Sequence, residues 1–465
     1  MIDEEIKDLM ISQDEWEEMF DNDGVITPEG KSGWVLAVSV AGHGGSVALL
    51  KDQRVVFYLK EERCSRYKRD SRTPFKCFEE VKKYTNELDK VISVNMSDGN
   101  IKRSLSYLNK LNIEVKSNIN QSMFPPNNRY VFGSEHHINH ASCGYHLSSF
   151  DEATAVVMDG WGWSGEARRL LDDPNDTYGT IEDELRYGVR VYDHCSIWRT
   201  GPTPDDWKLL WKEVSSDYTR NCNFEGDIPS IAHIEQDYRN FYTSIPGCED
   251  TEIHLAQPMS VPVCYESVTC FIGFDQEDVG KTMGLSCYGK PNDEIPSFLI
   301  DNEWKDTSDL VAGNILLNTV IYPQLQKYHQ DNHFDGNSYP PSFEQKADLA
   351  YAIQKDLEEK VICVVERAMR MNDCKNIVLS GGVFHNVMIN ELLTSKYPDY
   401  NFFADPLCDD AGQSYGAAMW YDKVITGVCE KNTTPKSMYL GPRIPKDELK
   451  ERVINAVDKY NCPVL

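Results

Sequence analysis

The sequence predicts an α/β protein with two lobes. Three strand-like stretches follow one another closely at residues 34–40, 46–50 and 55–60, and the short turns between them predict a β-meander. Apolar strands and helices with an apolar stripe then alternate, and the whole pattern occurs twice along the chain. Proteins built in this way bind ligands in a crevice at the ends of their strands, so we expect the functional site between the lobes.

Composition and charge narrow the class of protein. The chain has 465 residues, 41% of them hydrophobic, and a formal net charge of −27. This charge argues against broad non-specific binding to nucleic acid or to an anionic membrane, although it leaves room for a local basic channel. The 14 cysteines form no CxxC pair, which predicts reduced, buried thiols. The N-terminus is acidic and no apolar run approaches the roughly 20 residues that span a bilayer, so we expect a cytoplasmic protein with no membrane partner.

Changes in composition along the chain predict five regions. They are an accessory N-terminal arm at 1–32, a first lobe at 33–163, an insertion at 164–258, a second lobe at 259–428 and a C-terminal segment at 429–465. Periodicity fades in the insertion, which predicts a subdomain or long loops that form a binding surface. In the second lobe, apolar residues recur every four positions from Leu349 to Val365 and predict a helix of roughly 20 residues, with a short buried strand at 377–379.

The most informative motif is a pair of histidines one helical turn apart. His136 and His140 project from the same face of a predicted helix, and two carboxylates, Asp159 at a predicted strand end and Asp410 far downstream, can join them. Two imidazoles and carboxylates suit a divalent transition metal such as iron(II), manganese or zinc. His137 stands where a zinc protease helix needs its glutamate base, so that class is excluded. The alternative interpretation is a helix with polar core histidines.

Glycine-rich turns and basic residues indicate phosphate binding. One turn contains Gly42 and His43 between two strands, and another runs through Gly381 and Gly382 from a strand into a helix. Each can also be an ordinary tight turn. Lys281 and a cluster of six basic residues can contact phosphate or face solvent; the cluster comprises Arg63, Arg66, Lys68, Arg69, Arg72 and Lys76.

Together these motifs resemble the O-carbamoyltransferases related to nodulation and antibiotic-tailoring enzymes. The similar segments occur in the family's order over roughly residues 33–445, with one gap. They are Gly42-His43 with Ser46, the segment 61–68, the segment 136–141, 150–153 leading into Asp159-Gly160, 280–285 with Tyr288-Gly289, Gly381–Val383 with Asn386, and Asp410–Gly412.

The resemblance implies an α/β, two-lobed, actin-like (ribonuclease-H-like) nucleotide-binding fold with an inserted subdomain, related to the threonylcarbamoyl-adenosine tRNA enzymes. It also implies that ATP and carbamoyl phosphate give carbamoyl-adenylate, from which the carbamoyl group passes to a hydroxyl. A divalent metal, with iron(II) expected before manganese, zinc or magnesium, would then be held by His136, His140, Asp159 and Asp410. His43 and Asp159 would be catalytic, and either His43 or a nearby carboxylate would act as the general base. Cofactor contacts would come from Gly42, Arg63, Lys68, Lys281, Gly284, Gly381, Gly382, Asn386 and Gly412.

Three departures from the family pattern bear on function. Gly44 replaces the family's aspartate after the turn histidine. The region 164–258 is longer than in the family, so we expect it to recognise the acceptor. The segment 439–442 resembles the entry to a C-terminal adenylate-forming domain, yet the sequence ends at Leu465, so we expect that domain to be cut away or supplied by another chain.

The acceptor is expected to be a sugar or natural-product hydroxyl, or a 5-hydroxymethylpyrimidine in single-stranded or flipped nucleic acid. Aromatic residues that can stack on either are Trp198, Trp207, Trp211, Tyr218, Tyr238 and Tyr242, and basic residues that can contact a nucleic-acid backbone are Arg168, Arg169, Arg186 and Arg190. A homodimer is compatible with the sequence. Two alternatives are a threonylcarbamoyl-transferring tRNA enzyme, whose helix motif differs, and a non-catalytic nucleotide-binding module of the same fold.

Overall fold

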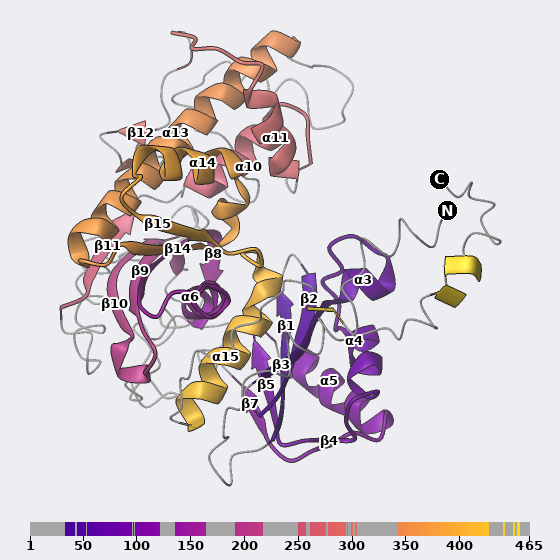
Figure 1. Cartoon of the computed structure of the whole chain (residues 1–465). Coiled ribbons are helices and arrows are strands. Elements are labelled where there is room, and N and C mark those ends of the chain that lie inside the picture. The colour runs from indigo at the N-terminus through magenta and orange to yellow at the C-terminus, as the bar shows by residue number, and fades with distance from the viewer. Residues whose placement is uncertain are drawn as a thin grey trace, which may run out of the picture. The chain divides into compact units, whose positions relative to one another are not determined.

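The computed structural model describes residues 33–41, 44–52, 54–94, 96, 98–120, 135–163, 191–216, 250–256, 261–275, 278–293, 295, 299–300, 303–304, 342–426, 440–441, 450–451 and 453–455. The chain divides into two compact units, one formed by Met1–Ile119 with Glu430–Leu465 and the other by Asn120–Cys429. Figure 1 shows the elements of both units, and each unit is described by itself below.

The first unit is built on a five-stranded mixed sheet in the order β3-β2-β1-β5-β7. Its strands are β1 (Trp34–Ala41), β2 (Gly44–Lys51), β3 (Arg54–Lys60), β5 (Lys90–Val94) and β7 (Asn118–Asn120), beside a short pair, β4 (Glu87–Leu88) and β6 (Glu114–Val115). Its helices are α3 (Glu61–Ser65), α4 (Phe75–Val81) and α5 (Asp98–Lys110). The strands β1, β2 and β3 pair antiparallel, and β5 adds to β1 in parallel, so the predicted meander is confirmed.

Alternation along the strands explains how the first unit packs. Leu36 and Val38 of β1 lie on one face of the sheet, in a core that also contains Phe78 of α4 and Leu108 of α5. Residues on the opposite face, such as Ala37, are also fully buried. The strands are therefore apolar on both faces, as is expected of a covered mixed sheet.

The second unit repeats this five-strand order and adds β11 in parallel at the edge beside β10, which gives a six-stranded sheet, β11-β10-β9-β8-β14-β15. Its strands are β8 (Ala153–Trp163), β9 (Val191–Thr200), β10 (Lys208–Ser216), β11 (Glu252–Ala256), β14 (Asn376–Ser380) and β15 (Asn401–Ala404), with a separate pair, β12 (Leu299–Ile300) and β13 (Glu303–Trp304). β8, β9 and β10 form an antiparallel meander, and β14 and β15 extend it in parallel from β8. An antiparallel meander continued by parallel strands on the far side of its first strand thus occurs twice, which is the ribonuclease-H-like arrangement of the predicted actin-like fold.

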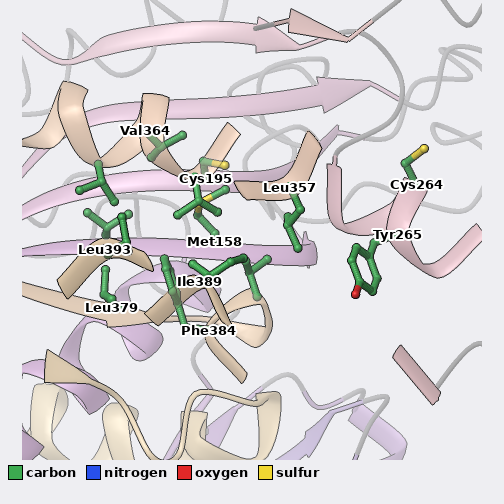
Figure 2. Packing of buried hydrophobic residues seen from close by; sticks show 14 of the residues in the cluster. Met158, Cys195, Cys264, Tyr265, Leu357, Val364, Leu379, Phe384, Ile389 and Leu393 are labelled. Carbon is green, nitrogen blue, oxygen red and sulfur yellow. The ribbon is translucent and has the colours of Figure 1, made fainter. Parts of the chain in front are cut away.

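Helices cover both faces of the second sheet. They are α6 (Glu135–Leu147), α10 (Val261–Phe271), α11 (Val279–Ser286), α13 (Phe343–Met371), α14 (Val387–Lys396) and α15 (Gln413–Thr426), with the 3₁₀ turns η2 (Pro204–Asp206), η4 (Gly382–His385) and η5 (Asp410–Gly412). Figure 2 shows the core on one face, where Met158 and Cys195 of the sheet lie close to Leu357 and Val364 of α13. α6 contacts β8, β9 and β14, and α15 packs on α6. The predicted helix over 349–365 is confirmed within α13, which begins with a capping box at Ser342.

The structure corrects two of the predicted boundaries. α6 and β8, predicted in a first lobe at 33–163, belong to the second unit because β8 pairs with β14 over four residues, from Thr154 to Val157. The described parts of the predicted insertion at 164–258 are three strands of the central sheet rather than an added subdomain. Local composition could not reveal this, because polar residues such as Asp193 and Ser196 are buried in β9 and obscure its alternation.

Some expectations fall outside the described residues. The predicted arm at 1–32 does, as do 164–190 and 217–249 of the predicted insertion. Most of the predicted C-terminal segment at 429–465 also lies outside the described residues; Glu430–Leu465 is assigned to the first unit, where the carbonyl of Leu440 accepts a hydrogen bond from Tyr58 N over 2.7 Å. Within the described part of the chain, no helix combines the length and the apolar character needed to cross a membrane.

Candidate metal centre

Close helix packing brings the two histidines of α6 to the end of the sheet. Gly144 of α6 lies against Val378 of β14, so that a Cβ atom at this position would be 2.6 Å from Val378 Cγ1. On the other side, a Cβ atom at Gly416 of α15 would be 1.9 Å from the carbonyl oxygen of Asn139. Both glycines therefore permit approaches that a side chain would block. These contacts hold α6 between the sheet and α15, with His136 and His140 buried.

The four residues predicted to bind metal lie together. Nε2 of His136 is 2.8 Å from Oδ2 of Asp159 and 3.4 Å from Oδ1 of Asp410. Nε2 of His140 is 3.7 Å from the same oxygen of Asp159 and 3.5 Å from that of Asp410. All four ligand atoms lie within 4.8 Å of one another. Residues from α6, β8 and η5 thus converge on one point in the second unit, and Asp159, which the sequence placed at a strand end, lies within β8.

The histidines and the carboxylates of the cluster shift one another's pKa values in opposite directions. Burial lowers the pKa of His136, but the charge of Asp410 and the contact with Asp159 outweigh burial and raise that pKa to about 10. Burial raises the pKa of Asp159, but its contacts with His136 and His140 hold that pKa well below its usual range. Without a cation, protons on the imidazoles therefore balance the two carboxylates. A divalent cation can take over this balance.

The donor set fits a divalent metal ion. Two imidazole nitrogens and two carboxylate oxygens are ligands that iron(II), manganese and zinc share, and both histidines are buried. Oδ1 of Asp159, on the side away from His136, accepts a hydrogen bond from the backbone N–H of Gly382 over 3.2 Å. Such a contact fixes the orientation of a ligating carboxylate.

The second glycine-rich turn lies at this cluster. Gly381 has a φ of 93°, and a Cβ atom there would be 2.3 Å from the carbonyl oxygen of Met158. At Gly382, a Cβ atom would be 2.8 Å from Oδ1 of Asp159. The two glycines therefore let η4 pass directly over β8 at Met158 and Asp159. Gly412 has a comparable position in η5, where a Cβ atom would be 1.9 Å from the carbonyl oxygen of Leu407.

Asn386 has a structural role that the sequence did not reveal. Its Oδ1 accepts from the backbone N–H of Ile389 and caps α14, while its Nδ2 donates to Gln354 over 2.8 Å.

Lys281 and Gly284, two further predicted cofactor contacts, lie on an open face of α11. Lys281 is 59% exposed and pairs with Asp278, and nothing lies within 4 Å of a Cβ atom at Gly284.

The other residues predicted to contact the cofactor or the acceptor fall into three groups: exposed residues of the first unit, residues outside the described part of the chain, and buried tryptophans. Arg63 and Lys68 are exposed in the first unit, where Arg63 lies 3.4 Å from Glu62. Gly42 and His43 fall outside the described residues, as do Tyr218, Tyr238, Tyr242, Arg168, Arg169, Arg186 and Arg190. The proposed stacking role of Trp198, Trp207 and Trp211 is wrong in this structure, because all three side chains are buried within the second unit. Large aromatic residues fill cores as readily as they bind ligands, and the sequence alone did not separate the two.

Sequence reasoning missed Gln413, which follows Asp410 by three residues at the start of α15. Its side chain is fully buried, and its Nε2 lies 2.9 Å from Nδ1 of His136 and 3.2 Å from Oδ1 of Asp410. The available signal was its spacing from Asp410, since residues three apart share a face of a helical segment.

Two units with the same ribonuclease-H-like strand order, one of them holding a buried His/Asp cluster, define an actin-like protein with a candidate metal centre. The chain belongs to the carbamoyltransferase family: residues 35–419 match the family model described as Carbamoyltransferase N-terminus.

Several known proteins are similar to this chain. It is 24% identical to the uncharacterized protein MJ1051 of Methanocaldococcus jannaschii over 90% of this chain and 62% of that protein. It is 25% identical to the nodulation protein NolNO of Sinorhizobium fredii over 42% of this chain and 28% of that protein. The chain thus spans less than two thirds of the length of these curated relatives. Among solved structures, full-length HypF in its phosphate- and nucleotide-bound form covers 86% of this chain and 57% of its own, with 13% identity and a TM-score of 0.42.

Proposed function

We propose that this chain is the carbamoyl-transferring part of an ATP-dependent O-carbamoyltransferase that binds a divalent metal at His136, His140, Asp159 and Asp410. The observation that carries the proposal is the convergence of these four ligand atoms within 4.8 Å, in a chain of the carbamoyltransferase family. A non-catalytic binding module would have no need to keep two buried histidines and two carboxylates at coordination spacing.

The proposed reaction has two balanced steps. In the first, water hydrolyses carbamoyl phosphate to carbamate and inorganic phosphate, and a carbamate oxygen then attacks the α-phosphate of ATP; pyrophosphate leaves and carbamoyl-adenylate forms. In the second, an acceptor hydroxyl attacks the carbamoyl carbon, the bond to the adenylate oxygen breaks, AMP leaves and the hydroxyl proton passes to a base. A bound divalent cation supplies charge neutralisation for phosphate and polarisation of the carbamoyl oxygen.

The residues of the second unit contribute orientation and charge. Asp159 is held from one side by the N–H of Gly382 and faces His136 from the other, so its carboxylate cannot rotate freely. The turn at Gly381–Gly382 passes over Met158 and Asp159 of β8 without a side chain, which leaves its backbone close to the cluster. General-base catalysis is assigned to His43 or a nearby carboxylate, and exposed Arg63 and Lys68 are proposed phosphate contacts.

The acceptor class remains part of the proposal. A sugar or natural-product hydroxyl, or a hydroxymethylated pyrimidine presented in single-stranded or flipped nucleic acid, supplies the required alcohol. The net charge of −27 favours the small-molecule acceptor over a large nucleic-acid footprint. We also propose a cytoplasmic location and a homodimer.

Mass spectrometry of candidate acceptors tests the proposal. The protein is incubated with ATP, carbamoyl phosphate and iron(II) or manganese, with aminoglycosides, sugars and 5-hydroxymethylpyrimidine DNA as acceptors. The expected result is a mass gain of one carbamoyl group on one acceptor class. A parallel reaction with synthetic carbamoyl-adenylate isolates the second step. No transfer from carbamoyl-adenylate to any acceptor would contradict the proposal, whereas transfer only from carbamoyl-adenylate would limit this chain to the second step.

A further inference from the structure

A buried carboxylate outside the cluster, that of Asp405, contacts three separate segments of the second unit. Its Oδ2 accepts a hydrogen bond from the Ser380 hydroxyl over 2.7 Å, and its Oδ1 accepts one from the backbone N–H of Leu407 over 2.8 Å. The thiol of Cys143, a weaker donor, lies 3.8 Å from the same Oδ1. Asp405 is only 2% exposed, and a buried carboxylate costs free energy unless its oxygens are hydrogen-bonded. Both oxygens of Asp405 are.

Two of these contacts lead to segments that carry or orient ligands of the candidate metal centre. Cys143 follows His140 by three residues on α6, so the two side chains share one side of that helix. Ser380 is the last residue of β14 and stands two residues before Gly382, whose N–H donates to Asp159. The buried carboxylate therefore links the helix of the two histidines to the turn that orients one of the ligating aspartates.

The third contact shapes the loop that delivers Asp410. Asp405 follows β15 directly, and its backbone N–H donates to the carbonyl of Leu379 over 2.8 Å. Its side chain accepts from the N–H of Leu407, two residues further on, which turns the chain at this point. The carbonyl oxygen of Leu407 would in turn lie 1.9 Å from a Cβ atom at Gly412. The loop is thus held at its start and packed at its end, with Asp410 between the two.

We propose that Asp405 is a positioning residue of the metal centre, whose carboxylate holds α6, the end of β14 and the loop before η5 in the arrangement that brings the four predicted ligands together. An amide of the same shape can make these contacts, because its oxygen accepts from Leu407 and its nitrogen donates to the Ser380 hydroxyl, which can also accept. The role therefore depends on hydrogen bonds and shape. The inference rests on the metal centre of the proposed function and not on carbamoyl transfer or on any acceptor.

Metal binding to the full chain, after treatment with a chelator, tests this role. Isothermal titration with manganese compares the wild type with Asp405→Ala, which loses all three contacts, and with Asp405→Asn, which keeps the shape of the side chain. We expect Asp405→Ala to weaken manganese binding about 10- to 100-fold, as loss of a partner behind the ligands does in other metal sites. Asp405→Asn is expected to restore most of the lost affinity.

Asp348→Ala is the matched control for the loss of a buried carboxylate in the same unit. Asp348 lies on α13 and accepts hydrogen bonds from the backbone N–H of Lys290 and the amide of Asn292, each over 3.1 Å. Both alanine variants should lower the Tm measured in chelator, because each leaves donors without their acceptor. Only Asp405→Ala should also weaken manganese binding. A purely structural role of Asp405 requires instead that both variants keep the wild-type affinity.

Optical absorption of the cobalt(II)-loaded proteins reports the ligand geometry independently of activity. We expect shifted bands in Asp405→Ala and wild-type bands in Asp405→Asn and Asp348→Ala. If Asp405→Ala does not fold, Ser380→Ala removes one of the three contacts and should give a smaller change in the same direction. Unchanged manganese affinity and unchanged cobalt bands in the alanine variant that is tested would overturn the inference and leave the metal centre in place. Failure of the wild type to bind either ion would overturn the proposed metal centre as well.

Discussion

The backbone N–H of Gly382 donates a hydrogen bond to Oδ1 of Asp159 over 3.2 Å. This contact joins two segments that are far apart in sequence, the turn after β14 and Asp159 within β8, and the two strands pair in parallel in the central sheet. The glycine-rich turn therefore serves the carboxylate of the proposed metal centre directly. This close contact explains why the turn has glycine at the positions nearest to β8.

Substitution of Gly381 by alanine should destabilise the second unit. The residue has a φ of 93°, and the new Cβ atom would meet the Met158 carbonyl oxygen at 2.3 Å. We expect a loss of at least about 1–3 kcal/mol in the free energy of unfolding, measured in urea. Gly284→Ala is the contrasting variant: it lies inside helix α11 with open space around it and should gain about 0.5–1 kcal/mol. Equal effects of the two substitutions would contradict this account.

Removal of the metal should lower the thermal stability of the protein, because a ligand that binds only the folded state stabilises it by mass action. At a free manganese concentration about 100 times Kd, the gain is about 2.7 kcal/mol. His140→Ala should weaken binding by at least about 100-fold and abolish the shift in Tm caused by manganese or by a chelator. His385→Ala, at an exposed position on η4, should keep the shift. A metal-dependent Tm in His140→Ala would argue against this centre.

Lys212→Met should be strongly destabilising. Lys212 and Asp193 pair over 2.9 Å on adjacent strands with both side chains fully buried, so the variant removes the cation from a buried carboxylate. The expected loss is about 3–5 kcal/mol in urea unfolding. Lys281→Met removes a cation that is 59% exposed beside Asp278 and should cost at most about 1 kcal/mol. Equal losses of unfolding free energy in Lys212→Met and Lys281→Met would show that burial of the Lys212–Asp193 pair does not matter.

The stability of the first unit should depend on pH through Asp70. The hydrogen bonds from Arg72 lower the pKa of Asp70 from 3.8 to about 2. A carboxyl group whose pKa is lower when folded contributes stability above pH 3.8, and this contribution disappears as the pH falls towards 2. It amounts to at most about 2 kcal/mol, since Arg72 is 73% exposed and solvent screens the pair.

Urea unfolding of the wild type and Asp70→Asn at several pH values measures this contribution. The difference between the two proteins should be constant near neutral pH and shrink below about pH 4. Lys76→Met, which removes an exposed partner of Glu79, provides the comparison for an ordinary surface pair. A difference that stays constant down to pH 3 would show that the carboxylate charge of Asp70 is not involved.

Motif spacing predicted which residues come together in the candidate centre. His136 and His140 are one turn apart on a helix, which local sequence determines, and the resemblance to the carbamoyltransferases added Asp159 and Asp410 by position. The structure brings all four together. Gln413 was missed because glutamine is not among the residues that the motif predicts, and only its contacts with His136 and Asp410 show that it lies at the cluster.

The sequence by itself determined the meander, the helix that carries His136 and His140, and the long helix α13, because each depends on a short-range sequence period. Only the tertiary structure decided the division of the chain, in which β8 joins β14 across more than two hundred residues and β9 and β10 complete the same sheet. It also showed that Trp198, Trp207 and Trp211 fill the core and that Asn386 caps a helix. Strand pairing and burial depend on contacts between distant segments, and these contacts have no period that a single sequence displays.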